Sequence, residues 1–258
     1  MPHRDQRFEN HSLRQLEFVE PKVDDSIHRI GQRLVEIRRH THSNPEPSGE
    51  ELETTAFIAA ELSNDGLAPK VCQQDIGLVA DFAIGAVDQG SSTIAIRADI
   101  DALRLPDQKD VPYKSQVNGI CHACGHDVHT AIALGSAFTL SAIADEFGGG
   151  AGAKLRFIFQ PAEETCEGAR WMVEQGVLDG VDSIIALHVD PELPAGVVGL
   201  RSGSLTASCD EVDILIEGRG GHGARPHQLT IPLRQLRCWL RRYIKPSQDP
   251  LIAAARPC

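Results

Sequence analysis

The sequence predicts an α/β fold with a mostly parallel central sheet over roughly the first 200 residues. Short apolar segments typical of buried strands alternate with longer segments of helical periodicity. Acidic and histidine side chains directly follow several of the apolar segments. Because parallel strands end at one edge of a sheet, and ligands bind beyond those ends, the same pattern predicts where a functional site lies.

Helical periodicity begins near the N-terminus. Apolar residues recur at helical spacing between Ile27 and Ile37 and predict an amphipathic helix over residues 24–42. Ser48, with Glu51 three residues later, matches a capping box, so we expect the next helix to begin at Ser48 and to run to about residue 65. Further helices are predicted over residues 127–147 and 167–175.

The strand predictions rest on alternating or continuous apolar runs. Every second residue from Ile76 to Ile84 is apolar, which is typical of a strand with one buried face. Further strands are predicted over residues 93–98, 154–160, 183–187 and 208–217. A glycine-rich loop at 148–152 leads into one of them.

Composition excludes several classes of protein. The chain is 41% hydrophobic and 24% charged, which is ordinary for a soluble globular protein, and its net charge of −11 argues against a nucleic-acid partner. No stretch approaches the ~20 apolar residues of a membrane span. Residues 1–20 lack the apolar centre of a secretory signal, so we expect a disordered N-terminal arm and a cytoplasmic location. The seven cysteines are then expected to be mostly reduced.

Two short runs carry the candidate chemistry. The run from His122 to Asp127 places a thiol, Cys124, two residues before an imidazole, His126. The second run ends with two adjacent carboxylates, Glu163 and Glu164, directly after an apolar strand. Thiolate, imidazole and carboxylate are ligands for zinc and similar divalent ions, and a neighbouring Glu that is not a ligand can act as a general base. Convergence of these groups predicts metal-assisted hydrolysis.

Three further positions have both a functional and a purely structural interpretation. Asp99 and Asp101 follow a predicted strand, where they either form a solvated turn or orient a ligand histidine. His188 ends another strand, and its position beside the other groups supports a role as a metal ligand. His222 lies in a glycine-rich segment that is either a hairpin loop or a lid whose histidine stabilises an oxyanion.

The pair Cys121 and Cys124 offers an alternative, because a C-x-x-C before a helix in an α/β chain also suggests a redox dithiol. It could be half of a zinc knuckle, but the sequence contains no second such pair.

In combination, these runs resemble the M20 metallopeptidase family in its amidohydrolase branch, which includes hippurate hydrolases, N-acyl-amino-acid amidohydrolases and the plant enzymes that cleave auxin–amino-acid (IAA-amino acid) conjugates. Six segments match in the expected order and cover roughly residues 30–228. They are Arg38 to Glu46 with Glu50 and Glu51, Arg97 to Leu103, Cys121 to His129, Gln160 to Gly168, Leu187 with His188, and Gly218 to His227.

The resemblance implies two divalent ions, with manganese or zinc expected and cobalt or nickel possible. Glu163 falls on the catalytic base of the family and Asp101 on an acidic position beside the ligands, which we group with the catalytic residues. His222 falls on a histidine that reaches the active site of the partner subunit in related enzymes. The metal-ligand positions are matched by Cys124, His126, Glu164 and His188.

The resemblance also implies an aminopeptidase-like catalytic domain at residues 21–203, the start of an inserted α+β dimerisation domain at 204–258, and a homodimer that hydrolyses the amide bond of small N-acyl amino acids. Residues 229–258 depart from the family pattern: they are rich in basic side chains, and no histidine follows His227 to act as the last ligand of the family. We therefore expect an incomplete, C-terminally truncated catalytic domain with impaired activity, the alternative being a catalytically inactive metal-binding remnant.

Overall fold

The computed structural model describes residues 6–147, 152–203 and 215. The chain divides into two units, Met1–Ala195 and Gly196–Cys258, which we treat separately. Of the second unit, the described residues are Gly196–Gly203 and Leu215. The predicted strand at 208–217 and the predicted insert at 204–258 therefore lie outside the described residues, apart from Leu215.

The first unit is built on a five-stranded sheet of order β1-β2-β4-β3-β5. β3 pairs in parallel with both β4 and β5, whereas β2 pairs antiparallel with both β1 and β4. The predicted α/β class with a mostly parallel centre is thus confirmed, and an antiparallel edge is added to it. The strands are β1 Pro69–Val71, β2 Leu78–Ile84, β3 Thr93–Asp99, β4 Ala153–Gln160 and β5 Ser183–Ala186.

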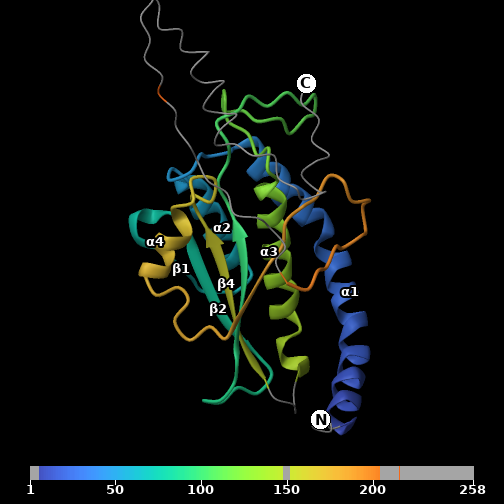
Figure 1. The fold of residues 1–258 in the computed structure, drawn as a ribbon. Coiled ribbons are helices and arrows are strands. Elements are labelled where there is room, and N and C mark those ends of the chain that lie inside the picture. The colour runs from blue at the N-terminus through green and yellow to red at the C-terminus, as the bar shows by residue number, and fades with distance from the viewer. Residues whose placement is uncertain (1–5, 148–151, 204–214, 216–258) are drawn as a thin grey trace, which may run out of the picture. The chain divides into compact units, whose positions relative to one another are not determined.

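Helices cover both faces of this sheet (Figure 1). On one face, α1 and α3 lie side by side with α2 beside them, and on the other α4 lies against β4. The first helix begins at Gln6, so it includes most of the segment that we expected to be a disordered arm. No helix among the described residues has both the length and the apolar character that a bilayer crossing requires. The helices are α1 Gln6–Ser43, α2 Leu52–Asn64, α3 His126–Ala142 and α4 Gly168–Glu174, with short 3-10 turns at Gln73–Asp75 and Ala144–Phe147.

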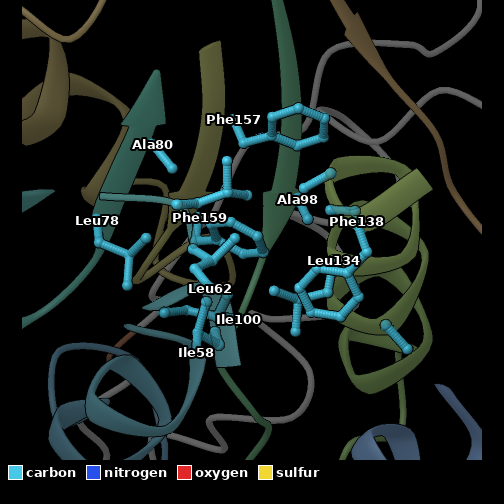
Figure 2. Packing of buried hydrophobic residues seen from close by; sticks show 14 of the residues in the cluster. Ile58, Leu62, Leu78, Ala80, Ala98, Ile100, Leu134, Phe138, Phe157 and Phe159 are labelled. Atoms are coloured by element: carbon cyan, nitrogen blue, oxygen red, sulfur yellow. The ribbon is translucent and has the colours of Figure 1, made fainter. Parts of the chain in front are cut away.

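Alternation along β4 creates two apolar layers. Phe157 and Phe159 are fully buried in the larger layer, beneath α1, α2 and α3 (Figure 2). Ile158 points to the opposite face and packs with Met172 of α4. Successive strand residues point to opposite faces of a sheet, so a strand buried on both sides reads as the continuous apolar run seen in the sequence. Burial of each such side chain contributes about 2–3 kcal/mol, which anchors β4 at the centre of the sheet.

The predicted capping box is wrong. α2 begins at Leu52, and neither Ser48 nor Glu51 caps it through a side chain. The amides of its first turn donate instead to the Glu46 carboxylate, at 3.1 and 2.7 Å. The Ser48 hydroxyl donates to Asp101, and the Glu51 carboxylate accepts a backbone amide from the loop after β4. Both side chains are directed to the site edge because stronger, buried partners compete there with the helix end.

Candidate metal centre

The candidate site lies at the carboxyl ends of the three parallel strands. The register pairs Asp99, the last residue of β3, with Gln160, the last residue of β4. The loops that follow β3, β4 and β5 carry Asp101, the Glu163–Glu164 pair and His188. The beginning of α3 brings Cys124 and His126 to the same place. This is the edge at which the sequence predicted a site.

A glycine between Cys124 and His126 shapes the start of α3. Gly125 has a φ of +92°, a left-handed conformation that side chains with a Cβ rarely adopt, and it is the N-cap of the helix. A Cβ at this position would overlap the Val189 side chain. The close approach of the two loops places Cys124 Sγ 3.3 Å from His188 Nε2.

His126 presents one free ring nitrogen to the carboxylates. Its Nδ1 donates to Asp101 Oδ1 at 3.0 Å, which leaves the lone pair on Nε2. Nε2 lies 3.8 Å from Glu163 Oε2 and 3.8 Å from Glu164 Oε1. Nε2 of His126 and Oε1 of Glu164 are both buried and without a hydrogen-bond partner. Such orphaned atoms are costly unless a further group satisfies them, and a cation between them would do so.

Asp101 ties the two sides of the site together. In addition to His126, its carboxylate accepts the Ser48 hydroxyl at 2.7 Å and the backbone N–H of Glu164 at 3.0 Å. Burial disfavours the charged form of Asp101, but these hydrogen bonds outweigh burial and lower its pKa. Asp101 is therefore an ionised, fully buried acceptor that fixes a candidate ligand on α3 and another on the loop after β4.

The electrostatics of the site favour a cation. Burial together with the charges of Glu164, Glu163 and Asp99 raises the pKa of the Cys124 thiol to about 12. Burial lowers the pKa of His126, but Asp101 and the neighbouring carboxylates reverse the effect and raise it. The negative charge around the donors contributes to both shifts, in addition to burial at Cys124. The S, N and O donors form three possible three-residue metal groups that share His126, and this donor set fits a divalent ion such as zinc or manganese.

The same shifts disfavour the dithiol alternative. Cys121 and Cys124 are both free thiols, and Cys124 faces His188. Burial raises the pKa of Cys121 as well. A redox dithiol requires a lowered pKa, because the thiolate is the reactive species, so this pair lacks the environment of one.

A hydrogen-bonded chain that sequence reasoning missed supports His188. His129 Nδ1 donates to Asp99 Oδ1 at 2.6 Å, and its Nε2 accepts the N–H of Val189 at 3.0 Å. His188 Nδ1 in turn donates to the Val189 carbonyl at 2.7 Å, which leaves its Nε2 facing Cys124. Burial opposes the charge of Asp99, but the His129 hydrogen bond and the charges of His126 and Arg97 hold its pKa at about 2. The spacing of His126 and His129, three residues apart on one helix face, was the available signal.

A buried polar cluster fixes the N-terminus of α3 against the end of α1. The Asp127 carboxylate accepts His42 Nδ1 at 2.7 Å and pairs with Arg38 Nε at 2.8 Å, and both partners come from the end of α1. The other ring nitrogen of His42 lies 3.3 Å from Asp107. These contacts join two helices that are distant in sequence, and they hold the first turn of α3, which carries His126, against α1.

The structure brings Cys124 and His188 together with His126 in one group, and Glu163 and Glu164 together with His126 in another, with the ligand atoms of each group within 4.8 Å of one another. The predicted lid residue His222 lies outside the described residues.

Comparison with known proteins places these residues in a family. The sequence profile of Peptidase family M20/M25/M40 matches residues 95–255, a range that also includes most of the segment expected to depart from the family pattern. The N-acetyl-L-cysteine deacetylase of Bacillus subtilis is 42% identical over 228 residues, which are 87% of this chain and 53% of that protein. Thermostable carboxypeptidase 2 of Saccharolobus solfataricus is 37% identical over 216 residues, 82% of this chain and 53% of that protein.

Among solved structures, the YXEP protein of Bacillus subtilis, reported as a dinuclear metal-binding peptidase from the M20 family, has a TM-score of 0.61 at 43% identity. The alignment covers 67% of this chain and 47% of that one. The chain spans about half the length of the curated relatives that it matches. The profile match, the sheet and the clustered donor atoms agree, and the chain belongs to peptidase family M20/M25/M40.

Proposed function

We propose that the protein to which this chain belongs hydrolyses the amide bond of N-acyl amino acids and binds two divalent metal ions to do so. The observation that carries the proposal is the buried, unpartnered Nε2 of His126, which faces Glu163 and Glu164 while Asp101 holds the opposite ring nitrogen. A histidine fixed in this tautomer among carboxylates is arranged to bind a cation.

The names of the relatives support the substrate class. An N-acetyl-L-cysteine deacetylase breaks an amide bond between an acyl group and an amino acid, and a carboxypeptidase breaks an amide bond before a C-terminal amino acid. Both leaving groups are amino acids with a free carboxylate. Small N-acyl amino acids are the narrower proposal, with short peptides as the competing substrates.

The proposed ligands are Cys124, His126, Glu164 and His188. Bound divalent ions supply Lewis acidity that polarises the scissile carbonyl. Asp101 keeps the His126 tautomer and the Glu164 backbone in place through the hydrogen bonds described above. His222, from the inserted domain, is proposed to stabilise the developing oxyanion across a homodimer interface.

The two adjacent glutamates receive different roles. Glu164 is anchored through its backbone to Asp101, its side chain is 21% exposed, and one of its oxygens is buried without a partner. The Glu163 side chain is 39% exposed, which leaves it free to meet substrate and water. Glu163 is therefore the proposed general base: it takes the proton of the attacking water and delivers it to the leaving amine nitrogen.

Glu163→Gln tests this assignment. The variant is expected to retain bound metal by elemental analysis while losing 10²- to 10⁴-fold in hydrolysis of N-acetyl-L-cysteine, the range for loss of a general base. Glu167→Gln, an exposed glutamate on the same loop, is the matched control and should match the parent. Retained turnover in Glu163→Gln would contradict the role. Metal binding by the parent without turnover would favour the inactive remnant, and absence of metal would contradict the whole proposal.

A further inference from the structure

One buried carboxylate near the centre has no role in the proposed chemistry. Glu51 lies directly before α2, and its side chain is fully buried. Its neighbour Glu50 is 61% exposed and pairs with Arg104 on the surface. A buried acid is costly unless its oxygens are satisfied, so the placement of Glu51 requires an explanation that Glu50 does not.

We propose that Glu51 is a positioning residue, which holds the turn after β4 in the conformation that points Glu163 and Glu164 at the metal centre. This inference rests on the proposed function, because it concerns the same pair of glutamates. Glu51 Oε1 accepts the N–H of Ala162 at 2.7 Å, between residues 111 positions apart in the chain. Ala162 directly precedes the pair and is itself buried.

The turn needs such support because its backbone is strained. Ala162 has a φ of +48°, in the left-handed region that residues with a Cβ rarely occupy. Such a conformation persists only where surrounding contacts enforce it. If Ala162 relaxed to a negative φ, the chain direction after Pro161 would change, and both glutamates would move away from His126.

Several hydrogen bonds hold the turn. Besides the bond from Ala162 N–H to Glu51, the Ala162 carbonyl accepts the N–H of Gly168 at 3.1 Å. Gly168 makes this approach possible, because a Cβ there would overlap the Pro161 carbonyl. Another bond joins Glu164 N–H to Asp101. Of these, the bond to Glu51 is the one made to the strained residue's own amide.

Glu51 is not a helix cap. It does not cap α2, whose first amides donate to Glu46. Its second oxygen is buried without a hydrogen-bond partner, so an apolar side chain of the same size would suit the burial better. Burial raises the pKa of Glu51, and the backbone N–H groups of Ala162, Glu51 and Gly49 act in the opposite direction. Of these three, Ala162 is the one distant in the chain, and the bond to it is the contact through which Glu51 reaches the turn.

A set of near-isosteric variants tests the proposal in the full chain. Glu51→Gln keeps an oxygen that can accept the Ala162 amide, whereas Glu51→Met fills the same space without an acceptor. Glu50→Met is the matched control at the exposed neighbour. Manganese affinity, measured by competition with a chromophoric chelator, should fall about tenfold or more in Glu51→Met and remain near the parent value in Glu51→Gln and Glu50→Met.

Ala162→Gly provides a second, independent test, because glycine adopts a positive φ at little cost. If Glu51 acts by holding a strained backbone, adding Ala162→Gly to Glu51→Met should restore part of the lost manganese affinity. Additive effects of the two changes, or a Glu51→Met chain that binds manganese like the parent, would overturn the proposal.

Backbone hydrogen exchange of residues 162–165, measured without metal, separates this inference from the proposed function. Faster exchange there in Glu51→Met than in Glu51→Gln is expected, and equal exchange would refute the role of Glu51. If the parent bound no manganese, the proposed function would fail while this measurement still decided the position of the turn.

Discussion

The sharpest single perturbation of the centre is Asp101→Asn, because the exchange is nearly isosteric: it changes the hydrogen-bonding capacity of the side chain and removes its negative charge. The carboxylate accepts from His126 Nδ1 through one oxygen and from the Ser48 hydroxyl and the Glu164 amide through the other. An asparagine side chain has an acceptor oxygen at one position and a donor NH₂ group at the other. In either orientation its NH₂ group faces an N–H, that of His126 or that of Glu164.

The expected magnitude is worked from that mismatch, and the loss of the negative charge of Asp101 weakens cation binding in the same direction. An unsatisfied buried donor costs about 1–3 kcal/mol, and about 1.4 kcal/mol corresponds to a factor of ten in affinity. If the whole cost falls on the conformation that binds metal, metal affinity should fall about five- to 150-fold. Partial relief comes from the Asp101 carbonyl, which also accepts His126 Nδ1 at 3.0 Å. We therefore expect the centre of this range, near tenfold to thirtyfold.

Isothermal titration of the metal-free chain with manganese and with zinc measures the effect, and urea unfolding shows whether the fold survives. Ser48→Ala is the matched control: it removes one donor to the same carboxylate and leaves the bonds to His126 and Glu164 intact, so affinity should change less than about threefold. An Asp101→Asn chain that binds either metal within about threefold of the parent would refute the role of Asp101 in fixing the ligands.

Three further changes test the fold around the centre. Phe157→Ala should lower the free energy of unfolding by about 3–5 kcal/mol in urea titrations, because the ring is fully buried. The same change at half-buried Phe82 should lower it clearly less, and equal losses would contradict the packing. Gly125→Ala should weaken manganese binding in calorimetric titrations, because both the φ of +92° and the nearby Val189 side chain oppose a Cβ at this position. Unchanged affinity would contradict the close approach of the loops that carry Gly125 and Val189. Backbone hydrogen bonds from Ser115 and Lys109 and nearby positive charges hold the pKa of Asp107 at about 2, so its contribution to stability is complete above about pH 4 and is lost as pH falls toward 2. The difference in unfolding free energy between the parent and Asp107→Asn should shrink over that interval, and a constant difference would refute the assignment.

Elements defined by a long or strongly periodic pattern were predictable from the sequence. The apolar runs of β3 and β4 and the helical segment of α3 identify the parallel centre of the sheet, because burial imposes a pattern that few other structures produce. The apolar run of β5 also indicated a strand, but β5 lies at the edge of the sheet and its residues are exposed. β1 is only three residues long and has no apolar alternation, so nothing in the sequence indicated it. Its existence depends on pairing with β2, a tertiary interaction.

The donor residues of the centre were predictable for a related reason. Cys124, His126, Glu163 and Glu164 are chemically distinctive side chains in short runs, and the topology of a parallel sheet brings together the loops at the carboxyl ends of its strands. Their supports were not predictable in the same way. Ser48 and Glu51 match a capping pattern that is correct in local terms, and only contacts to residues far along the chain redirect them to Asp101 and the turn after β4.

The hydrogen bonds to Asp99 and Asp101 explain how the site holds several carboxylates in fixed positions. Carboxylates in close proximity repel one another, and free side chains would separate. Here Asp99 is held by His129 and Arg97, and Asp101 by His126 and the Glu164 amide, so these two carboxylates cannot move apart. The repulsion is therefore retained in the folded chain rather than relaxed. A cation that enters this arrangement gains the attraction of groups already in place, and the free energy of binding is not spent on assembling them.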